Sequence, residues 1–121
     1  MKIISFAWTT PALLAGEKTV TRRDWNPKHA ARFKAGELVA AYDRQARFGG
    51  KKVAIIRLTR DPYLEWSDAI PPEDYDKEGF AYAMAHGLRF EGRTSSADVW
   101  RFWHEERHQQ WVVRFELVET L

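Results

Sequence analysis

The most regular pattern in the sequence lies near residue 115, where apolar and polar side chains alternate. The apolar positions are Trp111, Val113, Phe115 and Leu117. Arg114 and Glu116 fall between them. A period of two places the apolar side chains on one face of a β-strand and the charged ones on the other. The sequence therefore predicts a final strand here, in a fold that contains a β-sheet.

Less regular segments precede this strand. Apolar and β-branched residues predict further strands, which cover residues 2–7, 37–43 and 52–60. Residues 19–23 predict an exposed strand or strand-like loop. Gly49 and Gly50 supply turn chemistry between the strands at 37–43 and 52–60.

Caps and helix-ending residues mark the helices. They are predicted at 10–15, 27–33, 76–86 and 96–108. Ser95 and Asp98 fit a capping box at the start of the last helix, and Gly87 ends the helix before it. The prolines in residues 61–72 interrupt any regular pattern, so this segment predicts a loop.

The placement of helices among strands is too irregular for repeated βαβ units. It predicts an α+β fold whose mixed or antiparallel sheet curls into a small β-barrel with flanking helices. The 121 residues are close to the usual size of one domain, so we expect a single domain over residues 1–121.

The absence of cysteine excludes disulfides, thiolate metal sites and a cysteine nucleophile, and it suits a reducing compartment. The apolar stretch of residues 3–8 ends at Thr9, Thr10 and Pro11, which makes it too short for a signal or membrane-spanning segment. A cytoplasmic protein without membrane contact is therefore expected.

Charge is segregated along the chain although the net charge is only +2. Residues 18–60 hold twelve Lys or Arg against three acids, whereas residues 61–80 hold seven acids against one lysine. A basic segment favours a polyanionic partner such as single-stranded RNA. Alternatively, the two stretches neutralise each other across the fold.

Three segments carry a family resemblance. Residues 13–23 read Leu-Leu-Ala-Gly-Glu-Lys-Thr-Val-Thr-Arg-Arg, a short helix ending in Gly-x-Lys-Thr and followed by a polar residue and arginine. This resembles the signature of the ASCH domain family, and residues 33–39 and 77–80 continue the likeness. The resemblance implies a PUA-like β-barrel, a cleft between barrel and helices, and a role in RNA or nucleotide metabolism.

Thr21 departs from the glutamate that many members of that family have at this position. The Lys-Thr-x-Thr-x-Arg form is similar to a subgroup of small bacterial amidohydrolases that act on N(4)-acetylcytidine. That likeness implies a site made of Lys18, Thr21 and Glu78. In such a site Thr21 is the nucleophile, Lys18 is the base if its pKa is lowered by burial or nearby cations, and Glu78 assists the leaving amine. Lys18 must then lie in the turn after Gly16, since positions 18 and 21 of a regular strand face opposite ways.

Further residues are candidates for ligand contact. Arg23 shares a strand face with Thr21, whereas Arg22 is expected to point away from it. Trp25 lies in the basic segment with Lys28, where it can stack on a base or, alternatively, pack onto the loop that follows it. Most of the other tryptophans are expected in the core, Trp8 excepted. Two hypotheses follow: a module that binds RNA or a modified nucleoside, and an amidohydrolase for an acylated cytosine.

His104 and His108 have the i, i+4 spacing of a zinc-binding pair. The sequence His-Glu-Glu-Arg-His lacks a third ligand, and a charged, solvated helix face explains it better. No metal and no cofactor are expected.

Overall fold

A computed structural model describes residues 1–121. Its longest strand, β8 (Gln109–Thr120), holds the sheet together because it pairs with three others. The sheet has six strands in the order β1-β3-β4-β8-β2, and β5 also pairs with β8. The remaining strands are β1 (Ile3–Ser5), β2 (Val20–Arg23), β3 (Leu38–Tyr42), β4 (Lys52–Leu58) and β5 (Tyr63–Trp66).

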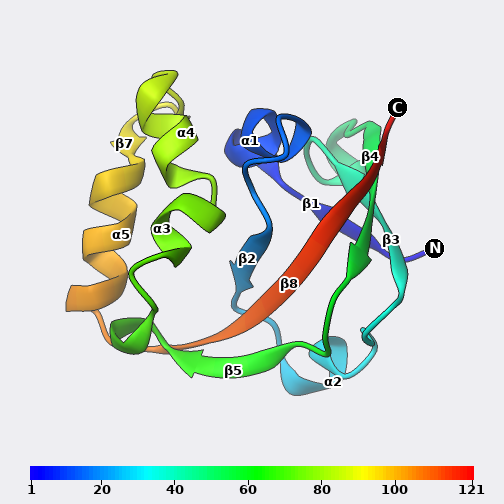
Figure 1. Ribbon diagram of the computed structural model, residues 1–121, viewed down its shortest axis with the longest axis horizontal. Helices are drawn as coiled ribbons and strands as arrows, with labels where there is room; N and C mark the ends of the chain where they lie inside the picture. The colour runs from blue at the N-terminus through cyan, green and yellow to red at the C-terminus, as the bar shows by residue number, and fades with distance from the viewer.

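The sheet curls into a half-barrel (Figure 1). β1 runs parallel to β3, and all other pairs are antiparallel. The register shifts near Tyr42 in the β3–β4 pair and near Ile56 in the β4–β8 pair, and such irregularities increase local bend and twist. β1 and β2 are the two ends of the strand order, so the barrel has a seam between them.

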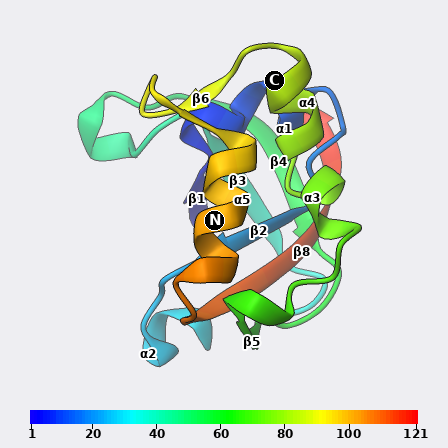
Figure 2. The same cartoon turned by 90° about the vertical axis from the view of Figure 1, so that its left-hand side faces the viewer.

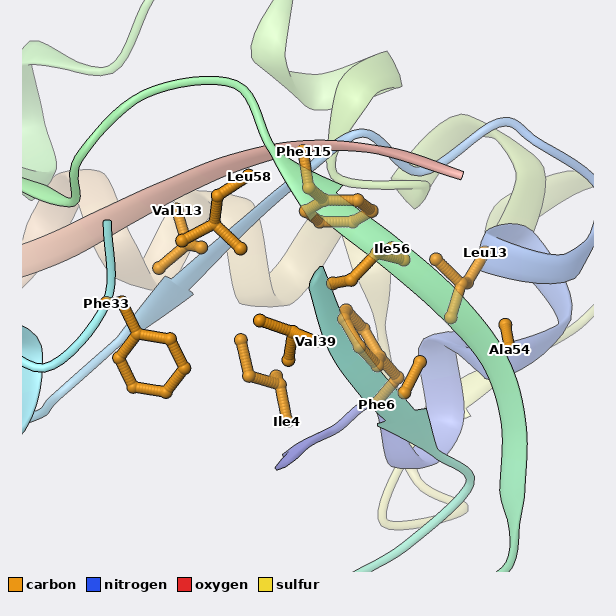
Figure 3. Packing of buried hydrophobic residues seen from close by; sticks show 11 residues of the cluster. Ile4, Phe6, Leu13, Phe33, Val39, Ala54, Ile56, Leu58, Val113 and Phe115 are labelled. Atoms are coloured by element: carbon orange, nitrogen blue, oxygen red, sulfur yellow. The ribbon is translucent and has the colours of Figure 1, made fainter. Parts of the chain in front are cut away.

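The concave face of the sheet holds the hydrophobic core. Figure 3 shows its side chains converging from β1, β3, β4 and β8, with Leu13 closing the core from α1. The core residues are Ile4, Phe6, Leu13, Phe33, Val39, Ala41, Ala54, Ile56, Leu58, Val113 and Phe115. Val113 and Phe115 lie on the apolar face predicted for the last strand, so that prediction is confirmed.

The helices form two groups. α1 (Thr10–Leu14) and α2 (Pro27–Ala30) lie at opposite ends of the barrel, whereas α3 (Asp74–Lys77), α4 (Phe80–Ala85) and α5 (Ser96–Glu105) stand together at its side (Figure 1). A small hairpin, β6 (Arg89–Phe90) and β7 (Thr94–Ser95), connects α4 to α5. Single 3-10 turns lie at η1 (Ala7–Thr9), η2 (Ala46–Phe48) and η3 (Ser67–Ala69). None of the helices has the length and apolar character of a membrane span.

The α+β class, the curled sheet and the capped last helix are as the sequence predicted. Ser95 accepts a hydrogen bond from the main-chain N–H of Asp98 at the start of α5. The loop predicted at 61–72 is wrong in part, because residues 63–66 form β5 along the edge of β8. The helix predicted at 76–86 is broken at Gly79, which adopts a left-handed φ of 84° between α3 and α4.

Candidate functional site

A cleft of about 710 Å³ separates the barrel from the helical side. One wall comes from β1, η1 and β2, and the other from α4, the β6–β7 hairpin and α5. The cleft lies along the seam of the half-barrel, since Ser5 of β1 and Thr21 of β2 both line it. Its polar floor contains Lys18, Thr21, Arg22, Arg23 and Glu78.

Lys18 and Glu78 form a buried ion pair on this floor. The Lys18 Nζ donates to the Glu78 Oε1 at 2.9 Å and to the Glu78 main-chain carbonyl at 2.8 Å. Each side chain is only 2% exposed. Lys18 lies in the turn that follows α1, as the sequence predicted, because its main-chain N–H donates to the carbonyl of Ala12.

The left-handed turn at Gly79 positions Glu78. It ends α3 directly after Glu78 and lets the chain enter α4 in a new direction. A Cβ at position 79 would lie 2.6 Å from the Cβ of Ala12 and 3.2 Å from that of Lys18. Only glycine therefore allows the α3–α4 turn to pack this tightly on the turn after α1.

Arg22 is buried behind this pair. Its guanidinium donates to the Glu78 Oε2 at 2.7 Å, to the Glu65 Oε1 at 2.8 Å and to Asp74. Arg114 donates to Asp74 from β8 at 2.7 Å. The exposed strand predicted at 19–23 is therefore wrong: β2 pairs with β8, the helical side covers it, and Thr21 and Arg22 are buried.

The buried network shows that part of the basic segment and part of the acidic segment neutralise each other, which was one of the two interpretations of the charge pattern. Cations from the basic segment, Lys18 and Arg22, pair with carboxylates from the acidic one, namely Glu65, Asp74 and Glu78. These charges neutralise each other inside the molecule. They are not available to a polyanionic partner.

Arg23 bridges the seam of the barrel. Its Nη2 donates to the carbonyl of Ser5 on β1 at 2.6 Å, and its Nε donates to the Thr21 Oγ1 at 3.1 Å. Both partners are neutral, so Arg23 is the cation of the cleft floor that no carboxylate pairs. As predicted from strand alternation, it lies on the same side as Thr21.

Burial and neighbouring charges shift the pKa values of these groups. Desolvation lowers the pKa of Lys18, aided by the Arg23 and Arg22 charges and opposed by Glu78. Burial also lowers the pKa of Arg23, to about 10, against the attraction of Glu78, which leaves the guanidinium charged at neutral pH. Burial alone would lower the pKa of Arg22, but Glu78, Asp74 and Glu65 raise it overall. Burial alone would raise the pKa of Asp74, but hydrogen bonds from Arg114 and Arg22 lower it overall.

Aromatic side chains line the cleft from both of its walls. Trp8 stacks on Phe80 with ring centroids 5.5 Å apart and meets the edge of Phe90 at 6.1 Å. Phe102 and Trp103 contribute from α5, and Phe102 is 55% exposed. Val99, Phe102 and Trp103, which are spaced to share one face of α5, all line the cleft, although most tryptophans were expected in the core. Helical spacing predicts an apolar face on this helix, but it does not predict whether the rest of the protein covers that face.

At the mouth of the cleft α5 presents three charged side chains. Asp98, Arg101 and Glu105 line it, with Arg101 donating to Asp98 at 2.6 Å and lying 3.9 Å from Glu105. None of these three residues is among the predicted site residues. Their i, i+3 and i+4 spacing is ordinary for a solvated helix, so the sequence carries no signal that separates them from other surface charges.

Trp25 and Lys28 lie outside the cleft. Trp25 is half-buried and stacks on Phe33 at 4.7 Å, below the barrel near α2, while Lys28 is exposed on α2. The predicted contact of these residues with a ligand stays a prediction. His104 and His108 do not share a helix face, since α5 ends at Glu105 and His108 contacts Ser67.

The structure brings Lys18, Thr21 and Glu78 together on one floor, with one difference from the predicted trio. Lys18 bonds Glu78, but Thr21 bonds Arg23 instead of Lys18. Both hydrogen bonds of the Lys18 ammonium thus go to Glu78, and the Thr21 hydroxyl accepts from the Arg23 guanidinium, which has no carboxylate partner.

No family model and no curated protein matches the chain. Among solved structures, the chain is similar to the crystal structure of protein EF3133 from Enterococcus faecalis V583, described by the family model DUF984. The TM-score is 0.61 at 15% sequence identity, over 99% of this chain and 77% of that one. The two chains share a mixed α+β fold with a strongly curled half-barrel sheet and small flanking helices. At this identity the likeness concerns the fold alone, so the function is argued from the cleft.

Proposed function

We propose that the cleft binds a modified nucleoside, with the base between the aromatic walls and a carbonyl-bearing substituent on the polar floor. The observation that carries the proposal is the Arg23 guanidinium, which has no carboxylate partner, donates to Thr21 and lines the same cleft as the buried Lys18–Glu78 pair and Trp8. A guanidinium without a carboxylate partner is suited to a carbonyl oxygen of the ligand.

The size and lining of the cleft support a small, flat ligand. Sites for small molecules commonly enclose about 300–1,000 Å³ and combine apolar walls with a few polar groups. The cleft has about 710 Å³ and is lined by both aromatic and charged side chains. Aromatic rings stack on an unpaired base whatever its hydrogen-bonding edge, so the floor must provide the selectivity.

The test is binding of N(4)-acetylcytidine and of cytidine to the purified protein, followed by calorimetry. N(4)-acetylcytidine should bind more tightly, and Arg23→Gln should remove most of the difference, because cytidine lacks the acyl carbonyl. Equal affinity for both nucleosides in the wild type and the variant would contradict the proposal. Loss of all binding in Arg23→Gln would instead mean that the variant no longer forms the seam, which circular dichroism would reveal.

A second candidate function is hydrolysis of the acyl group, and the lowered pKa of Lys18, in the cleft that Thr21 also lines, favours it. Neutral Lys18 accepts the proton of the Thr21 hydroxyl while Thr21 Oγ1 bonds to the acyl carbon. The C–N bond then breaks, and the proton returns to the departing cytosine amine with Glu78 holding Lys18 in place. Water releases the acyl group from Thr21 as a carboxylic acid.

Arg23 suits this reaction as well. Its guanidinium already donates to Thr21 and can stabilise negative charge that develops on the carbonyl oxygen. Release of cytidine from N(4)-acetylcytidine, followed by chromatography, tests the reaction. Binding without release would leave the first function alone, whereas release that survives Thr21→Val would exclude Thr21 as the nucleophile.

A further inference from the structure

The segment between β3 and β4 carries an unusual concentration of positive charge. We define residues 43–52 as the basic loop. It holds four cations, Arg44, Arg47, Lys51 and Lys52, against the single acid Asp43. The four cationic side chains are exposed, and none forms an ion pair. The Asp43 carboxylate is used inside the loop, where it accepts the main-chain N–H of Lys51 at 2.8 Å.

Phe48 lies in the middle of these charges and is 65% exposed. The guanidinium of Arg47 lies over its ring, 4.9 Å from the centroid. Neither the barrel core nor the cleft includes this ring. The loop therefore presents an exposed aromatic ring with cations on both sides of it in sequence.

The loop has a defined shape. Phe48, Gly49 and Gly50 donate main-chain hydrogen bonds back to Gln45 and Ala46 at 2.9–3.1 Å, and Asp43 donates to the Lys51 carbonyl at 3.1 Å. Gly50 packs on the backbone of Arg44 so closely that a Cβ would lie 1.9 Å from the Arg44 oxygen. Phe48 is thus held outward by an ordered turn.

The loop is separate from the cleft. In Figure 2 it extends away from the body of the molecule at the upper left. None of its residues lines the cleft, and the acidic residues 65, 74 and 78 that neutralise Lys18 and Arg22 do not reach it. Its positive charge is directed to solvent.

We propose that the basic loop binds single-stranded nucleic acid, with phosphates at its four cations and an unpaired base stacked on Phe48. Flexible cations next to an exposed aromatic ring match a chain of phosphates with accessible base faces. A lipid surface is a poorer match, because one phenylalanine offers little apolar area for insertion. The proposal does not rest on the nucleoside site in the cleft.

Fluorescence anisotropy with a labelled single-stranded RNA of about 12 nucleotides tests it, since strands of this length span a typical single-strand site. Affinity should fall with salt at a log–log slope near −3 if four phosphates are neutralised, at about −0.7 for each. Lys51→Gln/Lys52→Gln should reduce the slope by about 1.4. Phe48→Ala should weaken binding by roughly tenfold, and Phe48→Tyr should restore it.

The matched control is Lys34→Gln/Lys77→Gln, which removes the same charge from exposed lysines elsewhere. It should leave the salt slope unchanged. An equal loss in the control would show attraction by net charge alone and overturn the assignment to the loop. If duplex RNA binds as tightly as single-stranded RNA and Phe48→Ala has no effect, base stacking on Phe48 is excluded. If the protein binds vesicles containing phosphatidylserine but not RNA, nucleic acid is the wrong class of partner. N(4)-acetylcytidine binding in each variant reports on the cleft separately.

Discussion

The Lys18 ammonium donates to both the main-chain carbonyl and the carboxylate of Glu78, sixty residues further along the chain. The main-chain N–H of Thr19 also donates to the carbonyl of Lys77 at 2.8 Å. Lys18 follows α1 on the barrel side, and Glu78 ends α3 on the helical side. This pair therefore fastens together the two walls of the cleft.

Removal of the carboxylate should cost more stability than removal of the ammonium. Glu78→Gln leaves Lys18 and Arg22 buried with less negative charge, and a broken buried pair costs about 3–5 kcal/mol. Lys18→Met leaves Glu78 bonded to Arg22 and removes a desolvated charge, so we expect a loss below about 2 kcal/mol. Urea unfolding of the two variants measures both losses in the free energy of unfolding.

Glu116→Gln is the control for that comparison. It breaks the exposed pair with Arg57, which spans 3.2 Å, and should cost less than about 1 kcal/mol. Equal losses for Glu78→Gln and Lys18→Met would show that Glu78 does not hold Arg22 and Lys18 together.

Acid should destabilise the protein through Asp74. Its folded-state pKa is below the ordinary value of 3.8, because the hydrogen bonds from Arg114 and Arg22 outweigh desolvation. The unfolded chain thus binds a proton first, and stability is lost as pH falls from about 3.8 through the lower folded value. Asp74→Asn should flatten this part of the stability curve, measured as urea midpoints between neutral and acid pH. An unchanged slope would mean that another carboxylate is responsible.

Stacking in the cleft should depend on Trp8. Trp8→Ala should weaken nucleoside binding by about 1–3 kcal/mol and remove most of the tryptophan quenching that accompanies it. Trp25→Ala is the comparison, since Trp25 packs on Phe33 outside the cleft. If Trp25→Ala removes the quenching and Trp8→Ala does not, the ligand lies near α2 as the sequence first suggested.

The hydrolytic candidate predicts a specific pH dependence. Activity should rise with pH as Lys18 loses its proton, with an apparent pKa below the ordinary 10.5 of lysine. The Arg23 charge contributes to this lowering, so Arg23→Gln should move the rise to higher pH. The profile of kcat/KM separates this effect from a general loss of activity. A profile without a rise below the ordinary pKa of lysine would exclude Lys18 as the base.

Gly79→Ala should be more harmful than the same change at other left-handed glycines. Gly16→Ala and Gly87→Ala meet no atom within 4 Å and should lose only about 1–2 kcal/mol of backbone energy. Gly79→Ala adds the contact with Ala12 at 2.6 Å, for which overpacking costs about 1–3 kcal/mol more. Thermal unfolding of the three variants gives the comparison, and equal losses would contradict it.

Local patterns were sufficient to predict several elements. The alternation around Val113 and Phe115 predicts β8, and Ser95 with Asp98 predicts the start of α5, because both signals are contained within a few residues. Gly16 likewise predicts the turn that carries Lys18. These features depend on neighbours in sequence.

The rest depends on partners far along the chain. Two arginines in succession read as surface residues, and only the distant carboxylates Glu65, Asp74 and Glu78 explain the burial of Arg22. Residues 63–66 have no strand pattern of their own, and they form β5 because the edge of β8 is available. The exposure of Phe102 could not be predicted from the sequence either, because it depends on how far α5 lies from the barrel.

β8 has a consequence for the order of assembly. It joins β2, β4 and β5, and the ribosome makes it after all three. Until residues 109–120 have emerged, neither β2 nor β5 has a sheet partner, and Thr21 and Arg23 have no fixed place. The basic loop needs only β3 and β4, which pair with each other much earlier in synthesis. During translation the loop can thus exist before the cleft does.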